Sequence, residues 1–119
     1  MTHLLALHTR ATAAGPVLEL SGELDHRTAP DARTALRELD LESGQQLVLD
    51  LAGLTFCDST GITVFIAARN HALAAHAVIV LAAVPDRVNR IFRIAGLDHV
   101  FPTHPTAEAA EAAWRPAAT

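Results

Sequence analysis

The chain has 119 residues, with nine arginines, no lysine, 13 acidic residues and a formal net charge of −4. This length supports a single domain over residues 1–119, and a hydrophobic content of 50% excludes a disordered chain. The mildly acidic balance argues against direct binding to nucleic acid, which needs a basic surface.

The first predicted elements are a hairpin and a helix. Short apolar segments at 4–8 and 17–20 are typical of strands. Gly15-Pro16 between them has turn chemistry, so the two segments are expected to pair. A helix should open at Thr28, where an acidic residue follows three positions later as in a capping box, and end at Gly44.

The middle of the chain predicts two buried strands around a long helix. Residues 47–51 and 78–81 are almost all apolar, as in strands covered on both faces. The helix between them should span about 59–75 and is apolar around nearly its whole circumference. Such a helix is buried on more than one side, against the sheet and against either a neighbouring helix, which we favour, or a partner protein. No glycine ends it, so His76 should adopt a positive φ.

The last elements are shorter. A third helix should start with Pro85 in its first turn and place Gly96 at its C′ position, with Val84 as a poor N-cap. A weak strand at Val100-Phe101 is cut short by the proline that follows, and a fourth helix should begin at Thr106. The alternation of strands and helices predicts an α/β domain with helices packed on a sheet.

The segment Asp58-Ser59-Thr60-Gly61 carries the strongest functional signal, because it joins a buried strand to a helix. One interpretation is a helix cap, in which Asp58 or Ser59 accepts a hydrogen bond from a free amide of the first turn. The other interpretation is functional. A helix N-terminus favours anions, so the fold would tolerate a phosphoryl group on an exposed Ser59.

Enzyme motifs do not fit this segment. An aspartic-protease loop would be one residue shorter and needs a second carboxylate-bearing copy, a nucleophile elbow needs Gly where Cys57 stands, and a P-loop needs the lysine that the chain lacks. The histidine pairs, such as His71 and His76, are five residues apart, which does not suit one metal on a helix. Cys57 is expected to be a buried structural residue, and a single cysteine excludes an intramolecular disulfide framework.

Two further groups of charged residues stand out. Gly22-Glu23-Leu24-Asp25 connects the second strand to the first helix. It is either a turn with a solvated acidic pair or a surface beside Ser59 that offers carboxylates to a partner. The arginines Arg87, Arg90 and Arg93 lie along the third helix and are typical of a solvated face.

No segment resembles a leader or a membrane span. The apolar run at 4–7 is shorter than the about 7–15 residues of a secretory core. The run at 62–68 is shorter than the roughly 18–20 residues of a spanning helix. We expect a cytoplasmic protein without membrane insertion.

Taken together, four blocks resemble the STAS domain, and more narrowly the bacterial anti-sigma factor antagonists. The blocks are Ser21 to Asp25, Leu47 to Leu51, Asp58 to Gly61 and Ala95 to Phe101, and the resemblance spans about residues 4–113. It implies a mixed sheet of about four or five strands with helices mostly on one side. We expect no cofactor, no metal site and no catalytic residue.

The resemblance also implies a mechanism. Ser59 maps to the serine that an anti-sigma factor with serine kinase activity phosphorylates, and a PP2C-type phosphatase reverses the modification. The unmodified form binds the anti-sigma factor and releases the sigma factor. Asp25, Asp58, Thr60 and Gly61 map to the surface that contacts this partner.

Departures and alternatives accompany this resemblance. Cys57, Val84 and His76 stand where the family often has an aliphatic residue, a polar cap and a glycine, and none of them removes the phosphoacceptor. One alternative is a STAS scaffold or lipid-transport accessory protein that is never phosphorylated. The other is a small hydrolase that uses Ser59, for which His26 is the only histidine near a site loop.

Overall fold

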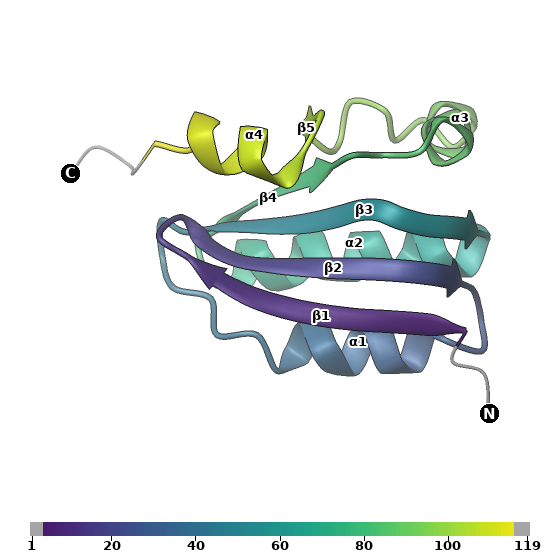
Figure 1. The fold of residues 1–119 in the computed structure, drawn as a ribbon, viewed down its shortest axis with the longest axis horizontal. Helices are drawn as coiled ribbons and strands as arrows, with labels where there is room; N and C mark the ends of the chain where they lie inside the picture. The colour runs from purple at the N-terminus through teal and green to yellow at the C-terminus, as the bar shows by residue number, and fades with distance from the viewer. Residues whose placement is uncertain (1–3, 116–119) are drawn as a thin grey trace.

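The computed structural model describes residues 4–115 and contains one mixed sheet. The elements are β1 (Leu5–Thr12), β2 (Gly15–Leu24), α1 (Ala29–Arg37), β3 (Gln46–Cys57), α2 (Ser59–Ala74), β4 (Val78–Ala82), α3 (Asp86–Ile94), β5 (Thr103–His104) and α4 (Ala107–Ala113). The sheet order is β1-β2-β3-β4-β5, with β1 antiparallel to β2 and all other pairs parallel (Figure 1). The predicted fold class is confirmed; the ends of the predicted 1–119 domain lie outside the described residues.

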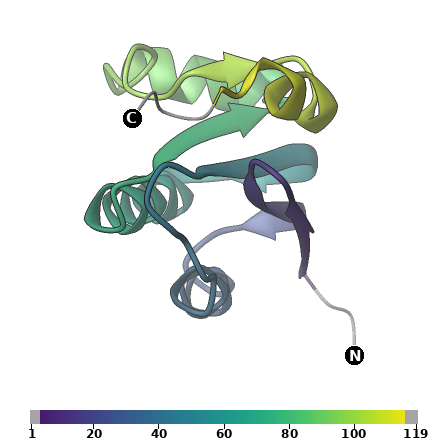
Figure 2. The same cartoon turned by 90° about the vertical axis from the view of Figure 1, so that its left-hand side faces the viewer.

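The helices cover the two faces of the sheet unequally. Figure 2 shows α1, α2 and α3 on one side and α4 on the other. The larger core joins Leu20 and Leu49 of the sheet to Phe65 of α2 and Phe92 of α3. A smaller core lies under α4 and consists of Val17, Val48, Val80, Ala82, Ala107 and Ala110. Helices therefore lie mostly on one side, as predicted.

The hairpin forms, but its turn differs from the prediction. Thr12 pairs with Gly15, so the turn consists of residues 13 and 14, and Gly15-Pro16 begins β2. The Thr12 hydroxyl closes this turn by donating to the Gly15 carbonyl oxygen at 2.7 Å. Gly15 has φ +140° and lies against the Gln46 backbone, where a Cβ would clash. It is needed at this strand contact rather than in the turn.

The first helix begins after Thr28 but without the predicted capping box. Thr28 has helical backbone angles, and its hydroxyl donates to the Glu23 carbonyl oxygen at 2.8 Å instead of capping α1. The predicted end at Gly44 is also wrong, because α1 stops at Arg37. Gly44, at φ +85°, instead lies in the connection that leads to β3.

The second and third helices end as predicted, with His76 at φ +59° and Gly96 at φ +75°. The third helix has Pro85 rather than Val84 as its N-cap. Because proline has no side-chain acceptor, this helix starts without a capping hydrogen bond.

The last strand, β5, lies two residues after Val100-Phe101, where the sequence predicted it. Phe101 is buried and stacks on Phe92 with ring centroids 5.7 Å apart, so Val100-Phe101 belongs to the core rather than the ladder. Pro102 does not end the pairing, because its carbonyl oxygen accepts from the Leu81 amide at 2.9 Å. The strand β5 begins at the next residue.

Candidate functional site

Two acidic loops lie side by side where β2 and β3 end. Leu24 and Cys57 are partners in the parallel ladder, and each is followed directly by an aspartate, Asp25 or Asp58. The Asp58 amide donates to the Leu24 carbonyl oxygen at 3.3 Å. Because the carboxyl ends of parallel strands share one edge, residues 33 positions apart in the chain form one surface.

Asp58 is the N-cap of α2 and leaves Ser59 free. Its carboxylate accepts from the Gly61 amide at 3.1 Å, as a cap should. Ser59 is the first residue of the helix and is exposed. Its hydroxyl makes no hydrogen bond within residues 4–115. The sequence offered either Asp58 or Ser59 as the N-cap of α2. In the structure, Asp58 is the N-cap.

Gly61 and Cys57 form the tight contact beneath the loop. A Cβ at Gly61 would lie 2.5 Å from the Cys57 sulfur and 2.9 Å from the Leu24 carbonyl oxygen. Only a glycine therefore lets α2 approach the strand ends so closely. Cys57 is buried, and desolvation together with the nearby Asp58 charge raises the pKa of its thiol to about 12. A thiol with this pKa is unreactive at neutral pH, which confirms the predicted structural cysteine.

Asp25 is held inside its own loop. Its side chain is only 7% exposed and lies 2.6 Å from the Arg27 guanidinium. The hydrogen bond from the Arg27 side chain is the main reason that the pKa of Asp25 falls from 3.8 to about 2. The interpretation of this segment as a solvated acidic pair is therefore wrong for Asp25. Contact between Asp25 and a partner stays a prediction.

The apolar second helix is enclosed mainly by its own domain, as expected. It packs on β3, β4 and α1, and Phe65 meets Phe92 of α3 edge to face at 5.7 Å. Two of its apolar side chains remain outside: Ile66 is 37% exposed and Leu73 50% exposed. Near the Ser59 loop, Phe56 at the end of β3 is 43% exposed.

Sequence reasoning missed two arginines beside the loops. Arg27 neutralises Asp25, and Arg33 of α1 donates to the Thr63 hydroxyl of α2 at 2.7 Å. The Arg33 contact joins residues 30 positions apart, so no local sequence pattern predicts it. The pairing of Asp25 with an arginine two residues later was visible in the sequence only as two opposite charges.

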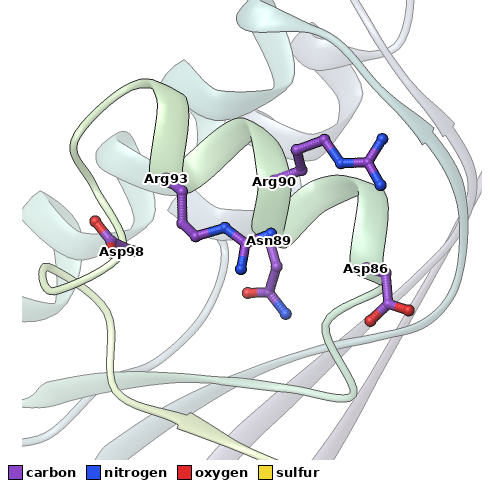
Figure 3. Close-up of a pocket in the computed structure, with 5 residues that line it drawn as sticks. All are labelled: Asp86, Asn89, Arg90, Arg93 and Asp98. Atoms are coloured by element: carbon purple, nitrogen blue, oxygen red, sulfur yellow. The ribbon is translucent and has the colours of Figure 1, made fainter.

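The arginine stripe of α3 is exposed, as predicted. A shallow hollow of about 460 Å³ on this helix is lined by Asp86, Asn89, Arg90, Arg93 and Asp98. Figure 3 shows Asn89 and Arg93 extending on the same side of the helix. The two carboxylates and two guanidiniums that line the hollow balance in formal charge. The hollow therefore favours neither an anionic nor a cationic ligand.

The part of the chain that the structure describes contains neither a metal-binding cluster nor a helix that could span a membrane. Within residues 4–115, no group of three or more His, Cys, Asp or Glu side chains is placed to hold a metal ion. In the same part of the chain, no helix has both the length and the apolar character needed to cross a membrane.

Comparison with known proteins identifies the family. Residues 7–103 match the family model described as "Mlab, STAS domain". An anti-sigma-B factor antagonist of Listeria monocytogenes is 35% identical over 81 residues, which cover 68% of this chain and 71% of that protein. A crystal structure of an anti-sigma factor antagonist from Mycobacterium paratuberculosis is similar with a TM-score of 0.81 and 27% identity, covering 93% and 94% of the two chains. The unphosphorylated antagonist SpoIIAA, at 21% identity and a TM-score of 0.70 over 90% and 95% of the chains, shares the fold. The sheet order, the loop at the ends of β2 and β3 and these similarities lead to one conclusion: the chain belongs to the STAS domain family.

Proposed function

We propose that this chain is an anti-sigma factor antagonist whose binding to its partner is controlled by phosphorylation of Ser59. In this proposal the unmodified chain binds an anti-sigma factor with serine kinase activity and releases a sigma factor. Phosphorylation of Ser59 ends that binding, and a PP2C-type phosphatase restores it. The chain acts as a cytoplasmic binding protein and not as an enzyme.

The observation that carries the proposal is that Asp58 caps α2 while Ser59 stays exposed. Asp58 supplies the cap of α2 through the Gly61 amide, so the fold does not depend on the Ser59 hydroxyl. That hydroxyl is exposed at a helix N-terminus, where the peptide dipoles favour an added anion. A phosphoryl group can therefore be added and removed without unfolding the helix.

The charge of the phosphate explains how such a switch acts on a partner. A phosphoserine carries about −1.5 to −2 charges near neutral pH. A partner docked on the neutral hydroxyl would have to bury a hydrated dianion, which is costly without new cationic groups. Asp58 stands next to this charge and adds repulsion toward any acidic group of the partner.

The neighbouring surface supports protein binding at the same place. Phe56 is 43% exposed beside the loop, and exposed aromatic side chains are enriched at interfaces. Thr60 and Gly61 form the first turn of α2 together with Ser59, while Asp25 fixes the adjacent turn through Arg27. We infer that Asp25 contributes mainly by shaping the surface that the partner meets.

The test combines modification with binding. The chain is incubated with an ATP-dependent anti-sigma factor kinase, and peptide mass mapping locates the phosphate. We expect it on Ser59 alone. Titration calorimetry should then show that the phosphorylated chain and Ser59→Asp bind the kinase at least about tenfold more weakly, a change of 1.4 kcal/mol. Aspartate carries only one charge, so it should weaken binding less than phosphate does.

Ser59→Ala is the matched control, since it should bind like the wild type and ignore ATP. Equal affinity of the wild type, Ser59→Ala and the phosphorylated chain would reject the switch. Absence of any phosphate would favour the alternative, a STAS scaffold or lipid-transport accessory protein that is not phosphorylated. Turnover of an ester that stops in Ser59→Ala would instead favour a hydrolase.

A further inference from the structure

We propose that Arg33 is the internal cationic partner of a phosphate on Ser59. This inference rests on the proposed function for its biological meaning. It states that the Arg33 guanidinium, which binds the Thr63 hydroxyl in the unmodified chain, moves to the phosphate when Ser59 is modified.

The placement of Ser59 and Thr63 carries the first step. They are four residues apart on α2 and therefore lie on the same face of the helix, with Cβ atoms about 5–6 Å apart. Helical side chains lean toward the N-terminus. Thr63 does so, because its hydroxyl donates to the Thr60 carbonyl oxygen at 2.6 Å. Whatever binds the Thr63 hydroxyl is thus held close to the first turn.

The second step is that this group is a cation without an ionic partner. Arg33 is half-buried on α1 and donates to the Thr63 hydroxyl at 2.7 Å. No ion pair links it to a carboxylate anywhere in residues 4–115. A neutral hydroxyl is a weak partner for a guanidinium compared with a phosphate, which accepts two parallel N–H bonds. Moving to the phosphate would therefore be favourable.

The other charged groups near the loop are less suited to this role. Arg27 is already bound to Asp25 at 2.6 Å and lies 3.6 Å from Glu23. Arg87 of α3 donates to the Thr55 carbonyl oxygen at 3.2 Å, at the end of β3 rather than on the face of α2 that holds Ser59. Asp58 is an anion and can only repel the phosphate.

The inference has a consequence for the switch. A guanidinium bound to the phosphate would hold the modified side chain in one orientation against α1 and α2. Part of the added charge would be neutralised inside the domain. The modified loop would then present an ordered arginine and phosphate pair, instead of a mobile dianion, to the partner and to the phosphatase.

The experiment needs neither kinase nor partner. Phosphoserine is incorporated genetically at position 59 of the full chain, and the second pKa of the phosphate is measured by ³¹P NMR titration. A nearby guanidinium favours the dianion and lowers this pKa. We expect Arg33→Gln to raise it by about 0.5 pH units or more relative to the unsubstituted phosphoprotein, and Arg33→Lys to raise it less.

Arg37→Gln is the matched control, because it removes the same charge one turn farther along α1, where Arg37 donates to the Thr34 hydroxyl. Its phosphate pKa should stay near that of the parent. Equal shifts in Arg33→Gln and Arg37→Gln would overturn the inference, as would a shift found only in Arg87→Gln. Circular dichroism confirms that each variant is folded. Failure here leaves the proposed kinase switch intact, whereas failure of the kinase to modify Ser59 would reject the switch and leave this titration valid.

Discussion

The loops that follow β2 and β3 start at the same level of the sheet but differ in how their aspartates are buried and bonded. Each begins with an aspartate directly after a residue of the Leu24 and Cys57 pair. Asp25 turns inward, is 7% exposed at its side chain and binds Arg27 and the amides of its own loop. Asp58 is only half-buried, caps α2 with one hydrogen bond and leaves Ser59 in solvent.

Under the proposed function, similar local chemistry serves structure in one loop and regulation in the next. A carboxylate that is already paired and hydrogen-bonded is expensive to disturb, so the loop of Asp25 is a fixed support. A loop closed by a single cap has unused groups at its surface. The proposed modification of Ser59 would therefore leave the first loop and the shared edge in place.

The contact between the loops is where we expect the largest effect. Gly61→Ala would place a Cβ 2.5 Å from the Cys57 sulfur and 2.9 Å from the Leu24 carbonyl oxygen. Overpacking of this kind typically costs about 1–3 kcal/mol, and the backbone oxygen cannot rotate away, so we expect a loss of about 2–3 kcal/mol in the free energy of unfolding. Chemical denaturation measures it.

A double variant identifies the cause. Cys57→Ala removes the sulfur, so adding it to Gly61→Ala should cost less than the sum of the two single changes. Strict additivity would show that the sulfur contact is not the source of the strain.

Asp25→Asn should have a smaller effect that depends on pH. In the folded chain the pKa of Asp25 lies at about 2, below its ordinary value of 3.8. A lowered pKa stabilises the fold above the ordinary value, and this stabilisation is lost as the pH falls from 3.8 toward 2. The wild type should therefore exceed Asp25→Asn in stability at neutral pH, and the two should converge in acid. Urea denaturation along a pH series measures this, and a gap that stays constant in acid would contradict the assigned cause.

The sequence predicted the parts of this comparison that depend on local patterns. The apolar runs located β3 and β4, and the polar residues after the first of them located the start of α2. The adjacency of the two loops was one of the two interpretations of the Gly22 to Asp25 segment, and the family resemblance favoured it by mapping both loops to one partner-binding surface. Position in the sheet was therefore predictable for both aspartates.

What the sequence could not predict was how each side chain is used. The burial of Asp25 depends on Arg27 folding back over it, and the Arg33 contact with Thr63 depends on the packing of α1 on α2. The hairpin turn and β5 were misplaced for a related reason. In both cases a residue typical of a turn, Gly15 or Pro102, is accommodated by a neighbouring strand through a backbone contact.

The smallest effects should distinguish the cap residue, Asp58, from the proposed phosphoacceptor, Ser59. Asp58→Ala removes the acceptor for the Gly61 amide and should lower the free energy of unfolding by about 1 kcal/mol, the usual scale of a lost N-cap. Ser59→Ala removes an exposed hydroxyl that makes no hydrogen bond within residues 4–115, so it should change stability by less than about 0.5 kcal/mol. Thermal or urea unfolding of the unphosphorylated chain distinguishes the two.

Thr106→Ala is a reference for the stability losses of Asp58→Ala and Ser59→Ala. Thr106 caps α4 by accepting from the Ala109 amide at 3.0 Å, and it lies far along the chain from Ser59. It should lose about as much stability as Asp58→Ala, since both remove one bond to a first-turn amide. A loss in Ser59→Ala equal to either cap variant would mean that the Ser59 hydroxyl also holds the helix start. Phosphorylation would then remove a structural bond as well as add charge, and the second loop would be less independent of the fold than its geometry indicates.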